Sequence, residues 1–231
     1  MKTLALVFAL LAAGSAPAFA QTTLAGWTFE TSAPVSSGPV APEIGTGVAS
    51  GSHAGVATYS SPSGNGSAHS FSSNTWGIGD FYQFTTSTLG SSGIAVSFDQ
   101  TGSATGPKDF KFSYSIDGTN FTQFATYGVL VNASPNPIWN SSTSSALFTN
   151  SFNLSSVGVL DNVANVYFRI SDTTTTSLNG GTVATGGTDR VDNFFITAIP
   201  EPSTYALFSG LAAFALIFFR RKAGPANSLM A

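Results

Sequence analysis

Apolar and polar residues alternate one by one in three segments of this chain, and this pattern restricts the fold more than any other feature. Residues 94–98, 110–116 and 166–170 each place apolar side chains at every second position. A period of two with one apolar face is typical of a half-buried antiparallel strand. No stretch between residues 21 and 199 has an apolar stripe with a period of 3.6, so we expect strands rather than helices there.

A turn sequence follows the second of these segments. Asp117-Gly118-Thr119-Asn120 separates it from Phe121-Thr122-Gln123-Phe124, which predicts a hairpin over residues 110–124 with Gly118 at positive φ. Four further strands are predicted, at residues 24–30, 81–86, 146–154 and 191–198. About eight strands separated by Gly, Ser, Thr and Pro predict an all-β fold, a two-sheet antiparallel sandwich or jelly roll. We expect the polar segments 33–74, 132–145 and 173–188 to be mobile loops at one rim, with residues 38–51 partly ordered.

Composition excludes several classes of protein. Charged residues make up 8 % of the chain, against roughly 25 % in an average soluble domain. Between residues 21 and 199, four cations face ten carboxylates, a net charge of −6, which is the opposite of the basic footprint of a nucleic-acid-binding protein. The absence of cysteine excludes disulfides, thiol catalysis and thiolate zinc sites. Aromatic residues reach 13 %, enough for a core, so disorder is not expected.

The N-terminal end carries a targeting sequence. Residues 1–20 contain one positive charge, an apolar run over residues 4–13 and small residues that close on Ala18-Phe19-Ala20. This pattern indicates a secretory signal peptide that passes through the Sec translocon, with Ala18 and Ala20 defining cleavage before Gln21. The alternative, an N-terminal membrane anchor, is disfavoured because the apolar run is about half of the ~20 residues that a bilayer requires.

The C-terminal end has three parts in a fixed order. Pro200-Glu201-Pro202-Ser203-Thr204 precedes the uncharged stretch 205–219, and the basic triplet Arg220-Arg221-Lys222 follows it. Counted from Pro202, 18 residues carry no charge, which predicts one transmembrane helix of marginal length. The basic triplet holds the flank after this helix in the cytoplasm, so the bulk of the chain faces outward. An ordinary C-terminal anchor and a buried core helix are the alternatives.

This tail resembles the PEP-CTERM protein-sorting signal of Gram-negative bacteria over residues 199–222, because all three parts occur in the family's order. The resemblance implies that an exosortase-type transpeptidase recognises the tail near Pro200 to Pro202 and cuts it. The protein is then expected to pass from a transient anchor in the inner membrane to the cell surface, the outer membrane or the extracellular matrix. Proteins of this family commonly accompany exopolysaccharide production. The extension 223–231 departs from the family pattern.

The predicted organisation of the chain follows from these two ends. It comprises a signal peptide (1–20), a β-sandwich ectodomain (21–199), the sorting motif (200–204), a transmembrane helix (205–219) and a basic cytoplasmic tail (220–231).

The two ends of the ectodomain carry a second resemblance. Trp27-Thr28-Phe29-Glu30-Thr31 and residues 189–196 are similar to the terminal strands of jelly-roll carbohydrate-binding modules. In those modules a glutamate on the first strand and an aspartate on the last often hold a structural calcium ion. The resemblance therefore implies Glu30 and Asp192 as calcium ligands, with backbone carbonyls completing the six to eight oxygens that calcium takes.

The residues needed for catalysis are scarce, and we do not expect an enzyme. His53 and His69 both lie in Gly/Ser-rich sequence, where exposed loop histidines are expected, and no G-x-S-x-G motif is present. A pair of carboxylates could hydrolyse a glycoside, but aspartate is also a common residue at strand ends and turns. The candidates for such a pair are Asp99, Asp109, Asp172, Asp189 and Asp192. The last two are also expected to form a structural ion-pair cluster with Arg190, which Arg169 could join.

Aromatic residues in polar sequence are the remaining candidates for ligand contact. Trp76, Trp139 and Tyr127 could stack on sugar rings, while burial as loop anchors is the alternative for the two tryptophans. Two functions follow from this reading. The first is a displayed module that binds exopolysaccharide or matrix, and the second is a structural matrix component without a specific ligand.

Overall fold

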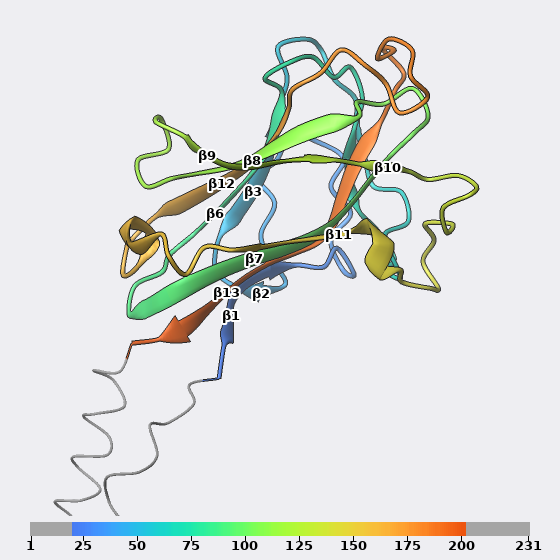
Figure 1. The fold of residues 1–231 in the computed structure, drawn as a ribbon. Helices are drawn as coiled ribbons and strands as arrows, with labels where there is room; N and C mark the ends of the chain where they lie inside the picture. Colours follow the sequence, from blue (N-terminus) through green and yellow to red (C-terminus); the bar gives the residue numbers. More distant parts are fainter. Residues whose placement is uncertain (1–19, 202–231) are drawn as a thin grey trace, which may run out of the picture.

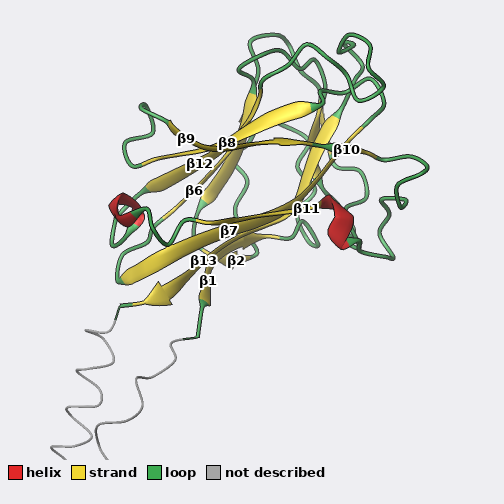
Figure 2. Cartoon of the chain, viewed as in Figure 1, coloured by secondary structure: helices red, strands yellow, loops and turns green. Residues whose placement is uncertain are grey.

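Two β-sheets pack face to face in the computed structural model, which describes residues 20–201 (Figure 1). The predicted all-β, two-sheet antiparallel sandwich is confirmed. The predicted signal peptide up to Phe19, and everything from Pro202 onward, including the transmembrane segment 205–219, lie outside the described residues. Within residues 20–201, no helix has the length and apolar character needed to cross a bilayer. Strands and loops make up almost all of this region, together with two short 3-10 helices (Figure 2).

One sheet has eight strands and the other has five. The main path of the eight-stranded sheet is β10 (Leu130–Val131), β7 (Ser91–Gly102), β13 (Asp189–Pro200), β1 (Thr22–Trp27) and β2 (Ile44–Gly45). Three shorter strands pair outside this path: β11 (Thr149–Asn153) with β7, β5 (Phe71–Ser73) with β13, and β4 (Tyr59–Ser60) with β5. The five-stranded sheet is ordered β3 (Val48–Ser52), β6 (Phe81–Thr86), β12 (Val166–Asp172), β8 (Asp109–Ser115) and β9 (Thr122–Gly128). The 3-10 helices are η1 (Ala146–Phe148) and η2 (Gly158–Leu160). All strand pairs are antiparallel except the short β10–β7 contact.

The alternating segments form strands as predicted, and β2 and β3 give residues 38–51 the partial order that we expected, while the prediction of a loop is wrong for residues 53–74. Gly118 has a φ of +73° in the turn between β8 and β9, as the hairpin requires. The segment 33–74 is not one long loop, because it contains β2 to β5. These strands are two to five residues long and rich in Gly and Ser, so pairing with distant strands defines them rather than their own alternation. The predicted strands 24–30 and 146–154 are shorter, since β1 ends at Trp27 and η1 precedes β11.

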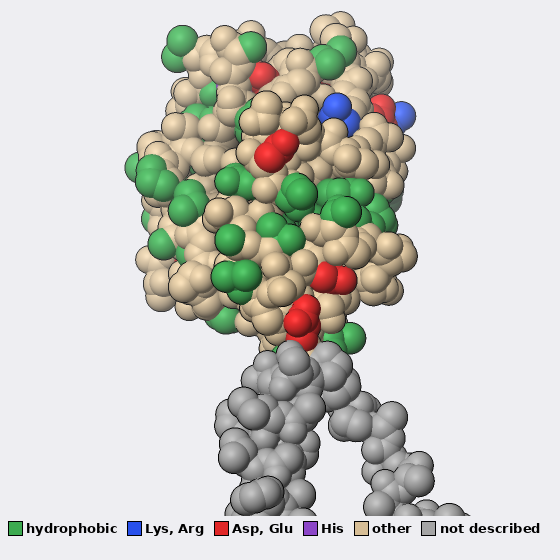
Figure 3. Space-filling model, turned by 90° about the vertical axis from the view of Figure 1, so that its left-hand side faces the viewer, with side chains coloured by type: hydrophobic (Ala, Val, Ile, Leu, Met, Phe, Trp, Pro, Cys, Tyr) green, Lys and Arg blue, Asp and Glu red, His purple; other side chains and the backbone are tan. Residues whose placement is uncertain are grey.

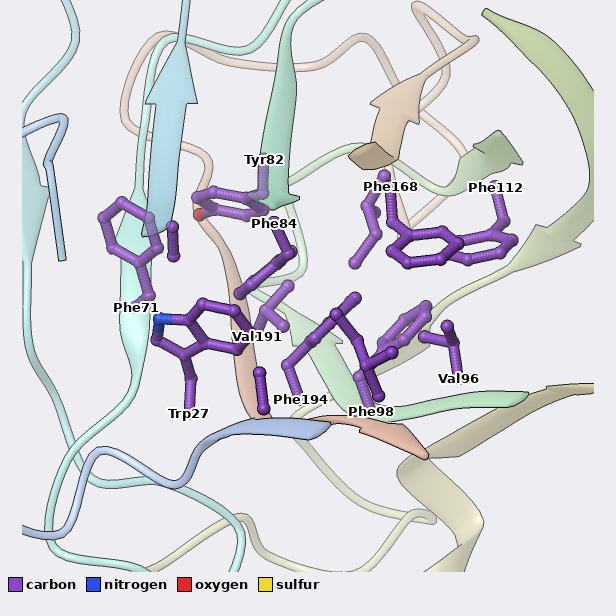
Figure 4. Packing of buried hydrophobic residues seen from close by; sticks show 14 of the residues in the cluster. Trp27, Phe71, Tyr82, Phe84, Val96, Phe98, Phe112, Phe168, Val191 and Phe194 are labelled. Atoms are coloured by element: carbon purple, nitrogen blue, oxygen red, sulfur yellow. The ribbon is translucent and has the colours of Figure 1, made fainter. Parts of the chain in front are cut away.

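Aromatic side chains fill the space between the two sheets (Figure 4). Phe84 of β6 stacks on Phe194 of β13 with ring centroids 3.6 Å apart, so this pair joins the sheets at their centre. Trp27 contacts Phe84 edge-on at 5.2 Å, and its indole Nε1 donates to the carbonyl of Val40. Burial of large aromatic surfaces therefore holds the sheets together.

The two ends of the described chain lie side by side. β1 pairs antiparallel with β13, with Thr22 opposite Ala198, so both ends leave the sandwich at the same end (Figure 1). The loop 173–188 lies at the opposite end of the sandwich (Figure 1). Pro200 closes β13 opposite Ser91, and the Glu201 N–H donates to the carbonyl of Gly90 at 2.9 Å. The first two residues of the predicted sorting motif thus continue directly from a paired strand.

Candidate binding sites

Both loop tryptophans are buried, which corresponds to the anchoring alternative. Trp76 is 7 % exposed, and its indole Nε1 donates to the Ser73 carbonyl at 2.9 Å. Trp139 is 4 % exposed, donates to the Ser63 carbonyl at 2.7 Å and packs edge-on against Phe148. Both rings fasten polar segments onto the sandwich, and in this structure neither is an open platform for a sugar.

Tyr127 belongs to a polar group between the sheets. Its hydroxyl donates to Oε1 of Gln100 at 2.6 Å, and Nε2 of Gln100 donates to both carboxylate oxygens of Asp189. Burial raises the pKa of Tyr127 and the pKa of Asp189 well above their usual ranges. The phenol is therefore tied to the interior of the sandwich.

The expectation of exposed histidines is wrong for His53, whose side chain is 1 % exposed. Its Nδ1 lies 3.0 Å from Oδ2 of Asp80, and its Nε2 lies 3.0 Å from Oγ of Ser73. This is the connectivity of a Ser-His-Asp triad, but Ser73 is fully buried and its hydroxyl also contacts the hydroxyl of Tyr82. A substrate has no access to such a nucleophile, so the network joins the end of β3 to β5 and β6. His69 is half-buried, with Nδ1 3.3 Å from the Ser61 carbonyl oxygen.

The two predicted calcium ligands contact adjacent residues of one loop. Glu30 is exposed and accepts a hydrogen bond from the Ala68 N–H, while Asp192 is fully buried and its Oδ2 accepts from the Ser67 hydroxyl at 2.6 Å. The other carboxylate oxygen, Oδ1 of Asp192, is buried without a partner. Burial raises the pKa of Asp192 to about 7. An unpartnered buried oxygen fits a cation.

Carboxylate ligands alone would not complete such a calcium site. The described residues contain no group of three or more His, Cys, Asp or Glu able to hold a metal. Most of the ligands would therefore have to be backbone oxygens.

A hollow of about 340 Å³ lies on the outer face of the eight-stranded sheet, where Asn65, from the same loop as Ser67 and Ala68, lines it. Asp99 also lines it, and its Oδ1 accepts from the Thr149 hydroxyl while its Oδ2 accepts from the side-chain amides of Asn65 and Asn193. Asn193 has a φ of +48° at a bulge in β13. The side-chain amide of Asn193 donates to Oδ2 of both Asp99 and Asp192, so these two aspartates are bridged and do not form an open acid–base pair.

The predicted ion-pair cluster does not form. Among residues 20–201 no Lys or Arg side chain lies within 4.0 Å of a carboxylate, and Asp189 is bonded to Gln100 rather than to Arg190. Arg190 keeps a buried Nε without a partner, and burial lowers its pKa. Arg169 lies on the other sheet, because β12 and β13 belong to different layers.

The remaining glycosidase candidates, Asp109 and Asp172, lie at the end of the five-stranded sheet. Asp172 is 1 % exposed, and burial raises its pKa to about 6. Asp109 is half-buried and starts β8.

The outer face of the five-stranded sheet presents a different arrangement. Alternation sends Phe168 and Ile170 of β12 into the core and leaves Tyr167, Arg169 and Ser171 on the outer face. Cross-strand neighbours on this face are mostly polar, with Gln83 of β6 and Ser113 of β8 directly opposite Arg169. We call this surface the outer β12 face; it comprises Ser50, Phe81, Gln83, Thr85, Lys111, Ser113, Phe121, Gln123, Tyr167, Arg169 and Ser171.

Two phenylalanine rings enclose the guanidinium group at the centre of the outer β12 face. The Cζ atom of Arg169 lies 3.8 Å from the ring centroid of Phe81 and 3.7 Å from that of Phe121. Its Nε donates to Oε1 of Gln83 at 2.8 Å. Sequence reasoning missed Phe81 and Phe121, although adjacent Phe81 and Tyr82 on one strand indicate that one of the two rings faces outward.

Comparison with known proteins gives a distant likeness in fold. No protein-family description matches the chain, and no curated protein matches it. Among solved structures it is similar to the CBM22-2 xylan-binding domain of Xyn10C from Paenibacillus barcinonensis, with 13 % identity over 76 % of this chain and 99 % of that domain and a TM-score of 0.47.

Two other solved structures show similar coverage. The K1 cleaved adhesin domain of Lys-gingipain from Porphyromonas gingivalis W83 has 13 % identity over 77 % of this chain and 97 % of that domain, with a TM-score of 0.42. TmCBM61, solved with β-1,4-galactotriose, has 13 % identity over 73 % of this chain and 92 % of that one, with a TM-score of 0.38. The chain thus has a distant structural resemblance to β-sandwich carbohydrate-binding modules.

Proposed function

We propose that this protein is exported, held briefly at the inner membrane by its C-terminal segment, and released by an exosortase-type transpeptidase to the cell surface or the extracellular matrix. The sequences of the two ends support this proposal. The pairing of β1 with β13 also supports it, because an anchor after β13 leaves the opposite end of the sandwich free to face outward.

The sorting step is tested by replacing two residues of the motif, Glu201→Ala with Pro202→Ala, in the full-length chain. The double variant should accumulate uncut in the membrane fraction, whereas the parent chain appears shortened outside the cell. Equal release of both chains would contradict processing at this motif. A Lys108→Ala variant, changed on an exposed charged residue far from the tail in sequence, provides the control for expression.

The ectodomain is proposed to bind polysaccharide over the outer β12 face. The observation that carries this proposal is the pair of aromatic rings, Phe81 and Phe121, set in a sheet face that otherwise presents amide, hydroxyl and basic side chains. Apolar rings contact the hydrophobic faces of sugars, and the surrounding polar groups bond their hydroxyls. A sheet face is long enough to contact several sugar units, since five strands about 4.8 Å apart span roughly 20 Å.

Binding is tested with the full-length chain in mild detergent on immobilised polysaccharides, including the producing organism's own exopolysaccharide. Phe121→Ala should weaken saturable binding, while Phe195→Ala, which removes a half-buried ring from the outer face of the opposite sheet, should not. An absence of binding to every polysaccharide would favour the alternative, a structural matrix component without a ligand. Structural calcium at Glu30 and Asp192 remains part of the proposal and would act on stability.

A further inference from the structure

A small groove on the outer β12 face gathers positive charge in an otherwise acidic ectodomain. The groove has a volume of about 150 Å³, and Lys111 and Arg169 both line it. They are two of only four cations between residues 21 and 199, where the net charge is −6. Charged side chains of either sign are sparse on the face that Figure 3 shows. Neither has a carboxylate within 4.0 Å among residues 20–201. Two cations are therefore placed together without the acidic partners that a structural ion pair would provide.

The guanidinium of Arg169 is held in one orientation before any ligand arrives. The Phe81 and Phe121 rings cover its two sides at 3.8 and 3.7 Å, and Gln83 fixes Nε. Contacts between a cation and aromatic ring faces are attractive, and a guanidinium group can stack on such faces. The two terminal nitrogens form no hydrogen bond with the described residues, so the remaining donors of the fork are free at the groove.

Two serine hydroxyls complete the donors of the groove. Ser113 and Ser171 lie opposite Arg169 and Lys111 in the sheet register, are 3 % and 5 % exposed, and make no side-chain hydrogen bond within the described chain. Gln123 lines the groove from the neighbouring strand β9. Both residues line the same small groove as the two cations, so their hydroxyls are placed to donate to a ligand bound there.

We infer that this groove binds the carboxylate of a uronic acid unit, which makes the ligand of the outer β12 face an acidic polysaccharide. This inference rests on the proposed function and specifies its substrate class. A carboxylate matches the planar guanidinium fork with two parallel hydrogen bonds, and Lys111 adds a second positive charge. A neutral sugar would leave both cations without a counter-charge. The net negative charge of the ectodomain disfavours long-range attraction of anions, so recognition depends on these short contacts.

The inference is tested with one polymer in two charge states. Polygalacturonate and its fully methyl-esterified form share a backbone but differ in the carboxylate charge. The full-length chain should bind polygalacturonate at least about tenfold more tightly than the ester, and raising the salt from 50 to 500 mM should reduce this preference by screening the charges. Arg169→Gln should remove the preference, while Lys108→Gln, which removes an exposed cation outside the groove, should keep it.

Two further variants guard against a folding defect. Arg169→Lys keeps the positive charge but loses the guanidinium fork, and Lys111→Gln leaves Arg169 between its two phenylalanine rings. Each variant should reduce the preference for polygalacturonate, while its thermal unfolding midpoint stays close to that of the parent chain. Equal binding of the two polymers, or an unchanged preference in Arg169→Gln, would overturn the uronate inference and leave polysaccharide binding standing. Failure to bind either polymer or any neutral polysaccharide would overturn both.

Discussion

Removing the ring of Phe194 should unfold much of the population under mild denaturing conditions. Phe194 is fully buried, stacks on Phe84 at 3.6 Å with an interplanar angle of 5°, and lies 5.5 Å from Phe98. Truncating a buried phenylalanine to alanine costs about 3–5 kcal/mol, and the loss of a stacked aromatic pair places this site in the upper part of that range. The neighbouring rings are rigid and belong to different strands, so they cannot collapse into the cavity. We therefore expect Phe194→Ala to lower the free energy of unfolding by about 4–5 kcal/mol, a large share of the 5–15 kcal/mol typical of a domain.

The next residue in the same strand provides the control. Phe195 lies on the outer face of the eight-stranded sheet and is half-buried, so Phe195→Ala should cost less than about 1.5 kcal/mol. The measurement is urea denaturation of the full-length chain followed by tryptophan fluorescence, comparing midpoints at equal slope. If Phe195→Ala destabilised the chain as much as Phe194→Ala, or if Phe194→Ala cost less than about 2 kcal/mol, the assignment of these faces and the packing argument would be refuted.

Two further predictions concern the buried polar groups. Burial raises the pKa of Asp192 to about 7 in the folded chain, from 3.8 when unfolded, so its contribution to stability is fully present below pH 3.8 and is lost as the pH rises through 7. Unfolding in chelator should therefore become easier between pH 4 and 7, and Asp192→Asn should flatten this slope. Calcium should restore stability at pH 8 in the parent chain only, and an identical slope in both chains would contradict the role of Asp192. Trp76→Ala should lower the unfolding free energy by about 3–5 kcal/mol without changing polysaccharide affinity of the folded fraction, and a loss of affinity at unchanged stability would show instead that the indole contacts the ligand.

Alternation along a strand was enough to predict the sandwich and the faces of its long strands. The pattern in residues 166–170 places Arg169 on the polar face and Phe168 in the core, as the structure has them. The short strands β2 to β5 were missed because strands of two to five residues carry no clear period of their own and depend on pairing with distant segments. Local sequence contains no information about such long-range partners.

The candidate sites are formed, even more than the fold, by contacts between residues that lie far apart in the sequence. Trp76 and His53 lie in polar sequence, yet their rings meet with centroids 4.5 Å apart beneath the surface. The groove around Arg169 also required the strand order β6-β12-β8, which brings Phe81 beside it, and the return of the chain after Gly118, which places Phe121 over it. Neither strand order nor loop return follows from alternation, so the sequence indicated the right kinds of residue but not their assembly.

The position of β13 has a mechanical consequence. This strand lies inside its sheet, paired with β7 on one side and β1 on the other, and the C-terminal tail continues from its end. Antiparallel hydrogen bonds run perpendicular to the strands, so tension applied along β13 from a tethered tail loads the bonds on both flanks in shear together instead of opening them one after another. A force that pulls on the end of β13 therefore meets the fold in its most resistant direction.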